Sequence, residues 1–387
     1  MKIVKSKLFS GLLMLLLFLP LTVFAGGQQE APVDKGATGA VDSEIQAAES
    51  ITVTDALGRE VTINGPIERI AFSISTTGEM LKIVGAWDMV VGVDWETANQ
   101  PVLFPNIDEL PVINSMTSQY DLNYESIYTL DPDVILVISV PTPGLDAMIE
   151  KLDSDIPVVA IADTSDPDAW TNGVSILGKL LDRESVAMEF TDWYKSIENG
   201  MKAKTALLSD NEKPKVFFKT VGMSPEQVCT YTNQFGYVRR LLEVSGGINI
   251  GADIPAPGGW VQNVDPEWLV KQNPDVVMAV SWEGYYSGAL GFGVEDSSTA
   301  EAVRTDMMAM PIFQDCGAVA NQKFFLFDTY FTSAPRFIVL MAYWGKWLHP
   351  DLFADIDPKS IHQEYLTRFM GIDYDLDQQG VFFYPEP

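Results

Sequence analysis

Two stretches of the chain repeat one pattern: Glu125–Ile135 reads ESIYTLDPDVI, and Glu267–Val277 reads EWLVKQNPDVV. In each copy a glutamate stands seven residues before a proline, and an apolar run follows the Pro-Asp pair. This pattern predicts a short helix that leads into a buried strand. Two copies therefore indicate a duplicated α/β unit.

A second, weaker sequence repeat precedes each copy, in the same order. LKIVG at 81–85 is followed by VGVD at 91–94, and LEVSG at 242–246 is followed by IGAD at 250–253. Around both, short apolar runs alternate with helical spacing, beginning with a hairpin at 52–54 and 60–63. Strands are expected at 70–72, 90–93, 134–140, 157–161, 216–218, 276–280 and 324–327. Helices are expected at 76–84, 123–130, 146–152, 237–244, 266–271, 334–348 and 358–369. Such alternation predicts parallel sheets with helical crossovers.

A longer helix is expected between the two copies, over 184–208. Its apolar residues recur at spacings that place them on one helix face: Val186, Phe190, Trp193, Ile197, Met201 and Leu208. The predicted fold is α/β, with two Rossmann-like lobes that contain parallel-type sheets and are joined by one long rigid α-helix. The N-terminal lobe is expected at 51–165, the interlobe helical segment at 166–209, and the C-terminal lobe with its tail at 210–387.

The composition excludes several classes of protein. The 387 residues carry 53 acidic and 25 basic side chains, a net charge of −28, which argues against nucleic-acid binding. A hydrophobic content of 47% rules out a mostly disordered chain. His349 and His362 are the only histidines, so a histidine-built metal site and histidine-based catalysis are not expected. Neither a nucleophile elbow nor a phosphate-binding glycine loop is present, and we expect no enzyme and no cofactor.

The first 25 residues have the features of a secretory signal peptide. Three lysines at 2, 5 and 7 precede an apolar run over 8–19, and Val23 and Ala25 supply the small residues of a cleavage site. The run is shorter than the roughly 20 apolar residues that span a bilayer, which disfavours a membrane anchor. Residues 26–50 are small, polar and acidic and predict a flexible linker. We therefore expect a protein exported to the periplasm or another extracytoplasmic space.

Two cysteines, Cys229 and Cys316, allow one disulfide in an oxidising compartment. Two separate buried thiols are the favoured alternative, because the spacing requires no bridge.

Glu125 and Glu267 each fall in the first turn of their predicted helix. A carboxylate there complements the helix dipole, and this is one interpretation of both residues. The other is that two related lobes each present one carboxylate to a basic pocket on a symmetric partner.

A ligand between two such lobes would contact loops at the carboxyl ends of the strands. Hydroxyls of Ser75 and Thr76 either bind ligand oxygens or only cap a helix. Arg336 is a candidate cation in the cleft, but Pro335-Arg336 opens a predicted helix, and a structural role is favoured. Aromatic side chains in these loops are suited to a flat or bulky ligand. The candidate ligand-binding residues are Ser75, Thr76, Trp95, Tyr120, Trp260, Trp282, Tyr285, Tyr286 and Tyr330.

The ordered set of motifs resembles the binding proteins of ABC importers for iron–siderophore complexes and vitamin B12. The resemblance begins with TVTDALGREVTI at 52–63 and ERI at 68–70, and it continues through GEMLKIVGAWDMVVGVD at 78–94, both Glu…Pro-Asp repeats and SAPR at 333–336. It covers about residues 51 to 370, and the order of the motifs is more specific than any one of them.

The resemblance implies that the ligand lies between two lobes bridged by one rigid helix. It also implies that Glu125 and Glu267 dock onto arginines of a dimeric membrane permease. The chain departs from the family in lacking the lipid-attachment cysteine found in many members. Its histidines lie near the C-terminus, unlike those of relatives that bind bare zinc or manganese.

We therefore expect a monomeric solute-binding protein that carries an iron–siderophore or similar metal chelate to an ABC permease. Cobalamin, haem or an oxyanion such as molybdate are alternative ligands, and a ligand sensor outside transport is an alternative function.

Overall fold

The computed structural model describes residues 50–387 apart from 116–117, 141–143, 153–154, 165 and 167. The predicted signal peptide and all but the last residue of the predicted linker lie outside the described residues. The described residues fall within one compact unit, so the lobe boundaries given above stay predictions. None of the described helices is long and apolar enough to cross a lipid bilayer.

The described chain begins with the expected hairpin. Strands β1 (Ile51–Thr54) and β2 (Glu60–Ile63) pair antiparallel. Asp55 holds the turn, because its carboxylate accepts hydrogen bonds from Leu57 N at 2.9 Å and Arg59 N at 3.0 Å and pairs with the Arg59 guanidinium at 2.6 Å. Gly58 has φ 77°, a conformation that glycine adopts without strain.

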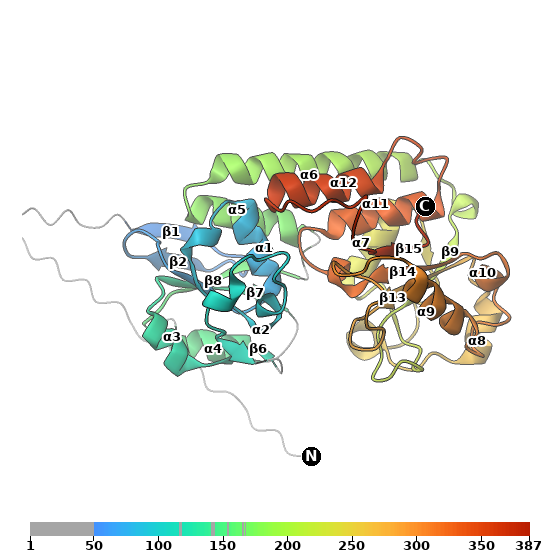
Figure 1. The fold of residues 1–387 in the computed structure, drawn as a ribbon, viewed down its shortest axis with the longest axis horizontal. Coiled ribbons are helices and arrows are strands. Elements are labelled where there is room, and N and C mark those ends of the chain that lie inside the picture. Colours follow the sequence, from blue (N-terminus) through green and yellow to red (C-terminus); the bar gives the residue numbers. More distant parts are fainter. Residues whose placement is uncertain (1–49, 116–117, 141–143, 153–154, 165, 167) are drawn as a thin grey trace, which may run out of the picture. The chain divides into compact units, whose positions relative to one another are not determined.

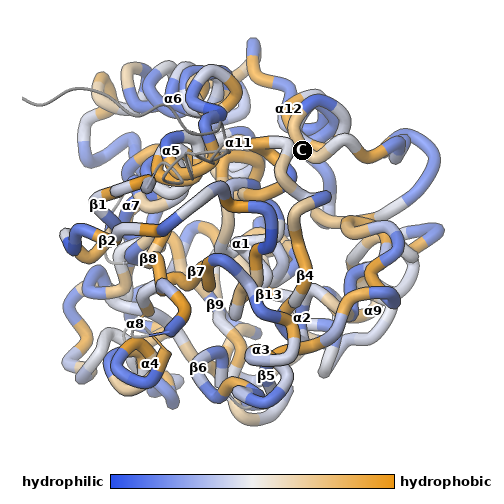
Figure 2. Tube along the Cα trace, turned by 90° about the vertical axis from the view of Figure 1, so that its left-hand side faces the viewer, coloured by the Kyte–Doolittle hydropathy of each residue, from blue (hydrophilic) through white to orange (hydrophobic). Residues whose placement is uncertain are grey.

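The N-terminal lobe is built on a parallel sheet (Figure 1). Its order is β4 (Val90–Gly92), β3 (Ile70–Phe72), β7 (Val134–Ser139) and β8 (Val158–Asp163). Every pairing in it is parallel, as predicted. Figure 2 shows β7 and β8 in hydrophobic colours, as expected for strands covered on both faces. A small antiparallel pair, β5 (Asn114–Ser115) and β6 (Ser118–Leu122), accompanies this sheet. The helices of this lobe are α1 (Ser75–Ile83), α2 (Trp95–Ala98), α3 (Tyr124–Leu130), α4 (Leu145–Leu152) and α5 (Ala169–Leu180).

The C-terminal lobe repeats this topology. Its sheet has the order β11 (Ile248–Asn249), β9 (Lys215–Lys219), β13 (Val276–Ser281), β14 (Phe324–Asp328) and β15 (Phe383–Tyr384). The first four strands are parallel, and β15 adds an antiparallel edge. A small antiparallel pair, β10 (Thr230–Tyr231) and β12 (Trp260–Val261), forms a separate sheet next to β9. The helices are α7 (Gly236–Ser245), α8 (Pro266–Gln272), α9 (Ser298–Met308), α10 (Gly317–Ala320), α11 (Phe337–Leu348) and α12 (Pro358–Glu364), the last continued by a π-helical turn over Tyr365–Phe369.

The Pro-Asp junctions of the sequence repeat have the same structural role in both lobes. The Asp133 carboxylate accepts a hydrogen bond from Arg69 N at 2.8 Å, and Asp133 N donates to Arg69 O at 2.9 Å. Asp275 makes the same two bonds with Lys215 at 2.8 and 2.9 Å. Each aspartate thus fixes the start of one central strand against the next, which explains why the motif occurs in both copies.

The long helix α6 (Glu184–Thr205) joins the two lobes. Toward one end it packs against α5 and α1, and toward the other end against α7 and α11 (Figure 1). Its 22 residues give a length of about 33 Å. The predicted end at Leu208 is three residues too late. The predicted face is partly wrong, because Val186 is exposed, and the buried residues of α6 are Ala187, Phe190, Thr191, Tyr194, Glu198, Met201 and Thr205.

The predicted helix over 334–348 also starts too early, since α11 begins at Phe337. Ala334 has φ 86°, which a right-handed helix does not contain, so the helix begins after it. Both cysteines are free and buried, which agrees with the favoured prediction of separate thiols.

Candidate functional site

The loops at the carboxyl ends of the strands hold most of the predicted ligand-binding residues. Ser75 and Thr76 follow β3 and open α1, and both are buried. The Ser75 hydroxyl donates to Glu96 Oε2 at 2.8 Å. The N-cap of α1 is Ile74, and no side chain caps the helix. The interpretation of these hydroxyls as helix caps is therefore wrong.

Trp95 follows β4, and its side chain is displayed at the surface. It is 42% exposed and opens the short helix α2. Asp94 caps α2 by accepting from Glu96 N at 2.9 Å and from the Thr97 hydroxyl. Burial raises the pKa of Asp94 to about 6, against the effect of these hydrogen bonds. The loop thus holds Trp95 outward on a firmly capped turn.

Tyr120 is placed differently from the other candidates. It is 5% exposed and lies in the core of the N-terminal lobe. Its hydroxyl donates to Ile138 O at 2.9 Å and accepts from Val140 N at 3.1 Å. Since both bonds tie it to the end of β7, we remove Tyr120 from the proposed ligand-binding set.

In the C-terminal lobe, the loop after β13 displays one tryptophan and anchors two tyrosines. Trp282 is 41% exposed, and its ring lies over Gly284, where an added Cβ would be 2.5 Å from the indole. The Tyr285 ring meets it edge-on at 4.7 Å. The hydroxyls of Tyr285 and Tyr286 donate to Gly222 O at 3.1 Å and to Pro225 O at 3.3 Å. The tyrosines therefore brace a neighbouring loop and leave Trp282 as the exposed aromatic.

Tyr330 and Trp260 are both half-buried. Trp260 begins β12 and pairs with Tyr231, so it lies in a short strand instead of the predicted loop. Tyr330 follows β14, and the Arg336 guanidinium lies 3.2 Å from the centre of its ring. Burial raises the pKa of the Tyr330 hydroxyl well above its ordinary value, and the carboxylate of Glu96 adds to this effect. Glu96 belongs to the N-terminal lobe, so its carboxylate acts on Tyr330 across the two lobes.

A buried ion pair joins the two lobes beside these loops. Glu79 of α1 pairs with Arg336, and the two side chains are 1% and 3% exposed. The Tyr365 hydroxyl donates to the other Glu79 oxygen at 2.5 Å. A second link runs from Arg240 of α7 to Glu198 of α6 at 2.7 Å and to Asp168 before α5 at 2.7 Å. The first link gives Arg336 the structural role that the sequence predicts.

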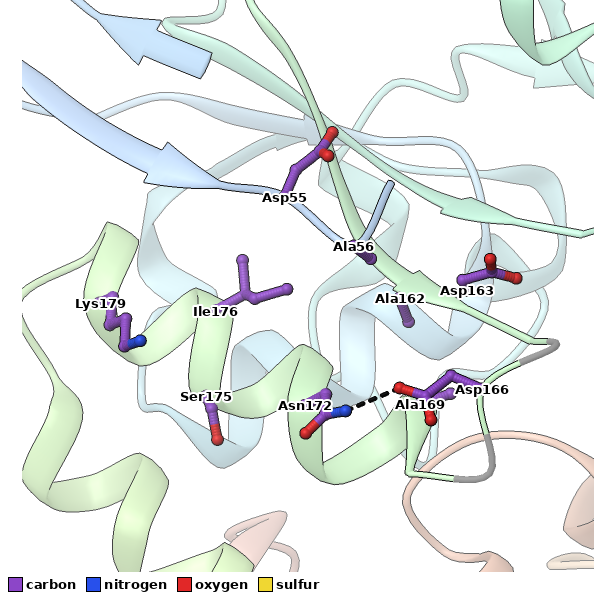
Figure 3. Close-up of a pocket in the computed structure, with 10 residues that line it drawn as sticks. All are labelled: Asp55, Ala56, Ala162, Asp163, Asp166, Ala169, Asn172, Ser175, Ile176 and Lys179. Atoms are coloured by element: carbon purple, nitrogen blue, oxygen red, sulfur yellow. Dashed lines mark hydrogen bonds between the residues drawn. The ribbon is translucent and has the colours of Figure 1, made fainter. Parts of the chain in front are cut away.

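Three cavities lined by described residues bear on the ligand site. One draws on both lobes and includes Trp170, Tyr237, Arg240 and Phe337, but its volume is only about 30 Å³, close to that of one water molecule. A cavity of about 290 Å³ lies in the N-terminal lobe between β8 and α5 (Figure 3), where Asp166 accepts a hydrogen bond from Asn172. A third, of about 460 Å³, lies beside α8. The first of these cavities is too small for a chelate, which needs several hundred Å³, and none of the candidate ligand-binding residues lines it.

The described residues offer no group of three or more His, Cys, Asp or Glu side chains that could hold a metal ion.

The two predicted docking glutamates occupy equivalent positions. Glu125 lies in the first turn of α3 after the N-cap Asn123, and Glu267 lies in the first turn of α8 after the N-cap Asp265. Each helix is seven residues long and ends in a left-handed residue with φ of 45° or 47°. Both glutamates are exposed, and neither side chain has an ion-pair or hydrogen-bond partner among the described residues.

Sequence reasoning missed the charged residues that face the loops. Glu79, Glu96 and Arg240 have no local motif, because their partners come from other elements, and Lys219 has no charged partner among the described residues. The only available signal was a charged residue at a position where the periodic pattern demands an apolar one, as with Glu79 inside the apolar face of α1 and Lys219 at the end of the apolar β9.

Comparisons with known proteins agree with this geometry. The sequence profile of the family described as periplasmic binding protein matches residues 70–330. The chain is 26% identical over 230 residues to the uncharacterized ABC transporter substrate-binding lipoprotein YvrC of Bacillus subtilis, a match that covers 59% of this chain and 68% of YvrC. It is 23% identical over 347 residues to the molybdate-binding protein MolA of Haemophilus influenzae, covering 86% and 91%. Among solved structures it is similar to the TroA-like periplasmic binding protein FepB of Veillonella parvula, with a TM-score of 0.71, 22% identity and coverage of 86% and 99%.

Proposed function

This chain belongs to the periplasmic binding protein family, and we propose that it is the substrate-binding protein of an ABC importer. It would take up a small-molecule ligand outside the cytoplasm and deliver it to a membrane permease. In this role the chain binds and releases its ligand without catalysing a reaction. The likeness to YvrC, whose name describes an ABC transporter substrate-binding lipoprotein, supports this proposal.

One observation carries the proposal: the duplicated fold displays the same exposed carboxylate twice. Glu125 and Glu267 each lie in the first turn of a short, capped helix. Each helix precedes the equivalent strand of its sheet, β7 or β13. A two-fold permease offers two equivalent basic sites, and two fixed carboxylates complement them. Helix-dipole complementation alone would not require both side chains to be free of partners within their own lobe.

We place the ligand at the carboxyl ends of the two sheets, where Trp95 and Trp282 are the exposed aromatics. Indole faces are suited to a bulky or flat ligand such as an iron–siderophore or another metal chelate. Cobalamin, haem and an oxyanion such as molybdate are the other candidates, and the name of the relative MolA supports the last. The remaining proposed contacts are Ser75, Thr76, Trp260, Tyr285, Tyr286 and Tyr330. The chain is proposed to act as a monomer, because its two docking residues lie on one chain.

Charge reversal at both glutamates tests the docking role. The double variant Glu125→Lys, Glu267→Lys is added to the reconstituted permease and its ATPase in liposomes. Loss of stimulated ATP hydrolysis and of ligand uptake is expected, because each lysine would face a basic pocket. The ligand affinity of the variant should stay unchanged, since both residues lie on exposed helices away from the proposed ligand contacts.

The matched control reverses one exposed first-turn acid in each lobe that has no proposed docking role. Asp146 of α4 and Glu301 of α9 meet this description. The double variant Asp146→Lys, Glu301→Lys changes the net charge by the same amount and should keep full uptake. Equal uptake by the two double variants would contradict the docking proposal.

A further inference from the structure

Lys219 is a buried ammonium group without a counter-ion among the described residues. It is the last residue of β9 and is 2% exposed. No described carboxylate lies within ion-pair distance of it, and no described acceptor is hydrogen-bonded to its Nζ. Arg336, the other buried lysine or arginine among the described residues, is paired with Glu79, and the half-buried Arg240 is paired with Glu198 and Asp168. Lys219 is therefore an exception that needs a physical explanation.

The residues next to Lys219 that the structure describes are uncharged. Its register partner on β13 is Ala279, and Thr220 N bonds to Cys229 O next to it. The Cys229 thiol donates to Gln262 O at 2.9 Å, so the sulfur is held in place by the backbone. Burial lowers the pKa of Lys219 to about 8 and the neighbouring Cys229 opposes this, so the amine still carries its proton at pH 7.

The position of Lys219 is at the ligand-facing edge of the sheet. It ends a central strand of the C-terminal lobe, and its carboxyl end leads into the loop at 221–227. That loop is braced by the hydroxyls of Tyr285 and Tyr286. The exposed Trp282 side chain packs against Tyr285. The strand that ends at Lys219 therefore leads directly into the loops that we have assigned to the ligand.

We propose that Lys219 receives a negatively charged group of the transported ligand, a carboxylate or an oxyanion. This inference rests on the proposed function and narrows its ligand to an anion. A charge-assisted bond to a buried ammonium is stronger than one between neutral groups. The protein as a whole repels anions, with a net charge of −28, so an anionic ligand needs a local cation of this kind.

Isothermal titration calorimetry with defined probes tests the inference. The probes are sodium molybdate, ferric citrate and, as a ligand without net charge, cyanocobalamin. One of the two anions should bind one-to-one, and Lys219→Met should weaken that binding by about 10- to 100-fold, because a hydrogen bond between charged groups is lost. Lys219→Arg keeps the charge and should recover most of the affinity. Lys323→Met, at the opposite and exposed edge of the same sheet, should bind like the wild type.

Folding of the variant is checked by the unfolding midpoint of the ligand-free protein. Lys219→Met should be at least as stable as the wild type, because an unpaired charge leaves the interior. A destabilised Lys219→Met protein would contradict the unpaired state of the ammonium. In that case Lys219→Gln provides the binding comparison.

Three results would overturn the inference: binding of neither anion, binding of an anion with unchanged affinity in Lys219→Met, or binding of cyanocobalamin alone. None of them bears on docking. A carrier of a neutral ligand would still lose uptake when Glu125 and Glu267 are reversed. The two proposals can therefore fail separately.

Discussion

The buried pair Glu79–Arg336 provides a quantitative test of how the lobes are held together. Its two side chains are 1% and 3% exposed, and Glu79 also accepts the Tyr365 hydroxyl at 2.5 Å. Glu79→Ala leaves the Arg336 guanidinium buried without a counter-charge. Removal of one partner from a buried pair costs about 3–5 kcal/mol. Because Glu79 belongs to α1 and its partners to the C-terminal lobe, we expect a loss of this size in the free energy of unfolding.

Urea denaturation at pH 7, followed by both circular dichroism and tryptophan fluorescence, measures this loss. Arg336→Met should cost a similar amount, since it leaves the Glu79 carboxylate unpaired. The double variant Glu79→Leu, Arg336→Met removes both charges and should lie within about 2 kcal/mol of the wild type. Single variants that cost less than about 1 kcal/mol, or double losses that simply add, would refute a buried coupled pair.

Further predictions concern groups whose titration or oxidation the fold controls. Burial lowers the pKa of His362 to about 3, so the unfolded chain gains the proton first as the pH falls below 6.5. Stability is therefore lost between pH 6.5 and about 3. In this range the free energy of unfolding, measured by urea denaturation, should change less steeply with pH in His362→Gln than in the wild type, by about 1.4 kcal/mol per pH unit. Burial raises the pKa of Asp328 to about 6, so Asp328→Asn should stabilise the protein by about 3 kcal/mol at pH 7 and by less than about 1 kcal/mol near pH 4, which urea titrations at both pH values will decide. Cys229 and Cys316 are buried and free, so a thiol reagent should find two reactive groups in denaturant and almost none in the native protein without reductant; two unreactive cysteines in denaturant would mean a disulfide.

The parts of the fold that could be predicted from sequence are those set by local signals. Asp265-Pro266-Glu267 is a capped helix start, and the left-handed Asn273 before Pro274 ends the same helix. Apolar runs then give the buried parallel strands. Because the same signals occur at Glu125–Ile135, the duplication and the equivalent placement of the two glutamates followed from sequence alone.

The remaining features depend on contacts between distant segments. The buried face of α6 includes Glu198, which sequence periodicity assigns to solvent, because Arg240 of another helix supplies its counter-charge. The sequence predicts Tyr120 as an aromatic side chain in a ligand-binding loop. It is buried instead, because its hydroxyl bonds to the backbone at the end of β7. Lys219 could not be singled out, since its meaning comes from the absence of a partner in three dimensions.

Native mass spectrometry of the protein isolated from its own host tests the central claim most directly. A carrier should retain one discrete small molecule per chain, and the double variant Trp95→Ala, Trp282→Ala should lose most of it while the fold is preserved. Exposed Tyr128→Ala is a matched aromatic control outside the proposed ligand contacts and should keep the ligand. A wild-type chain without any bound small molecule, or equal retention by the double tryptophan variant, would contradict a ligand held between the two sheets.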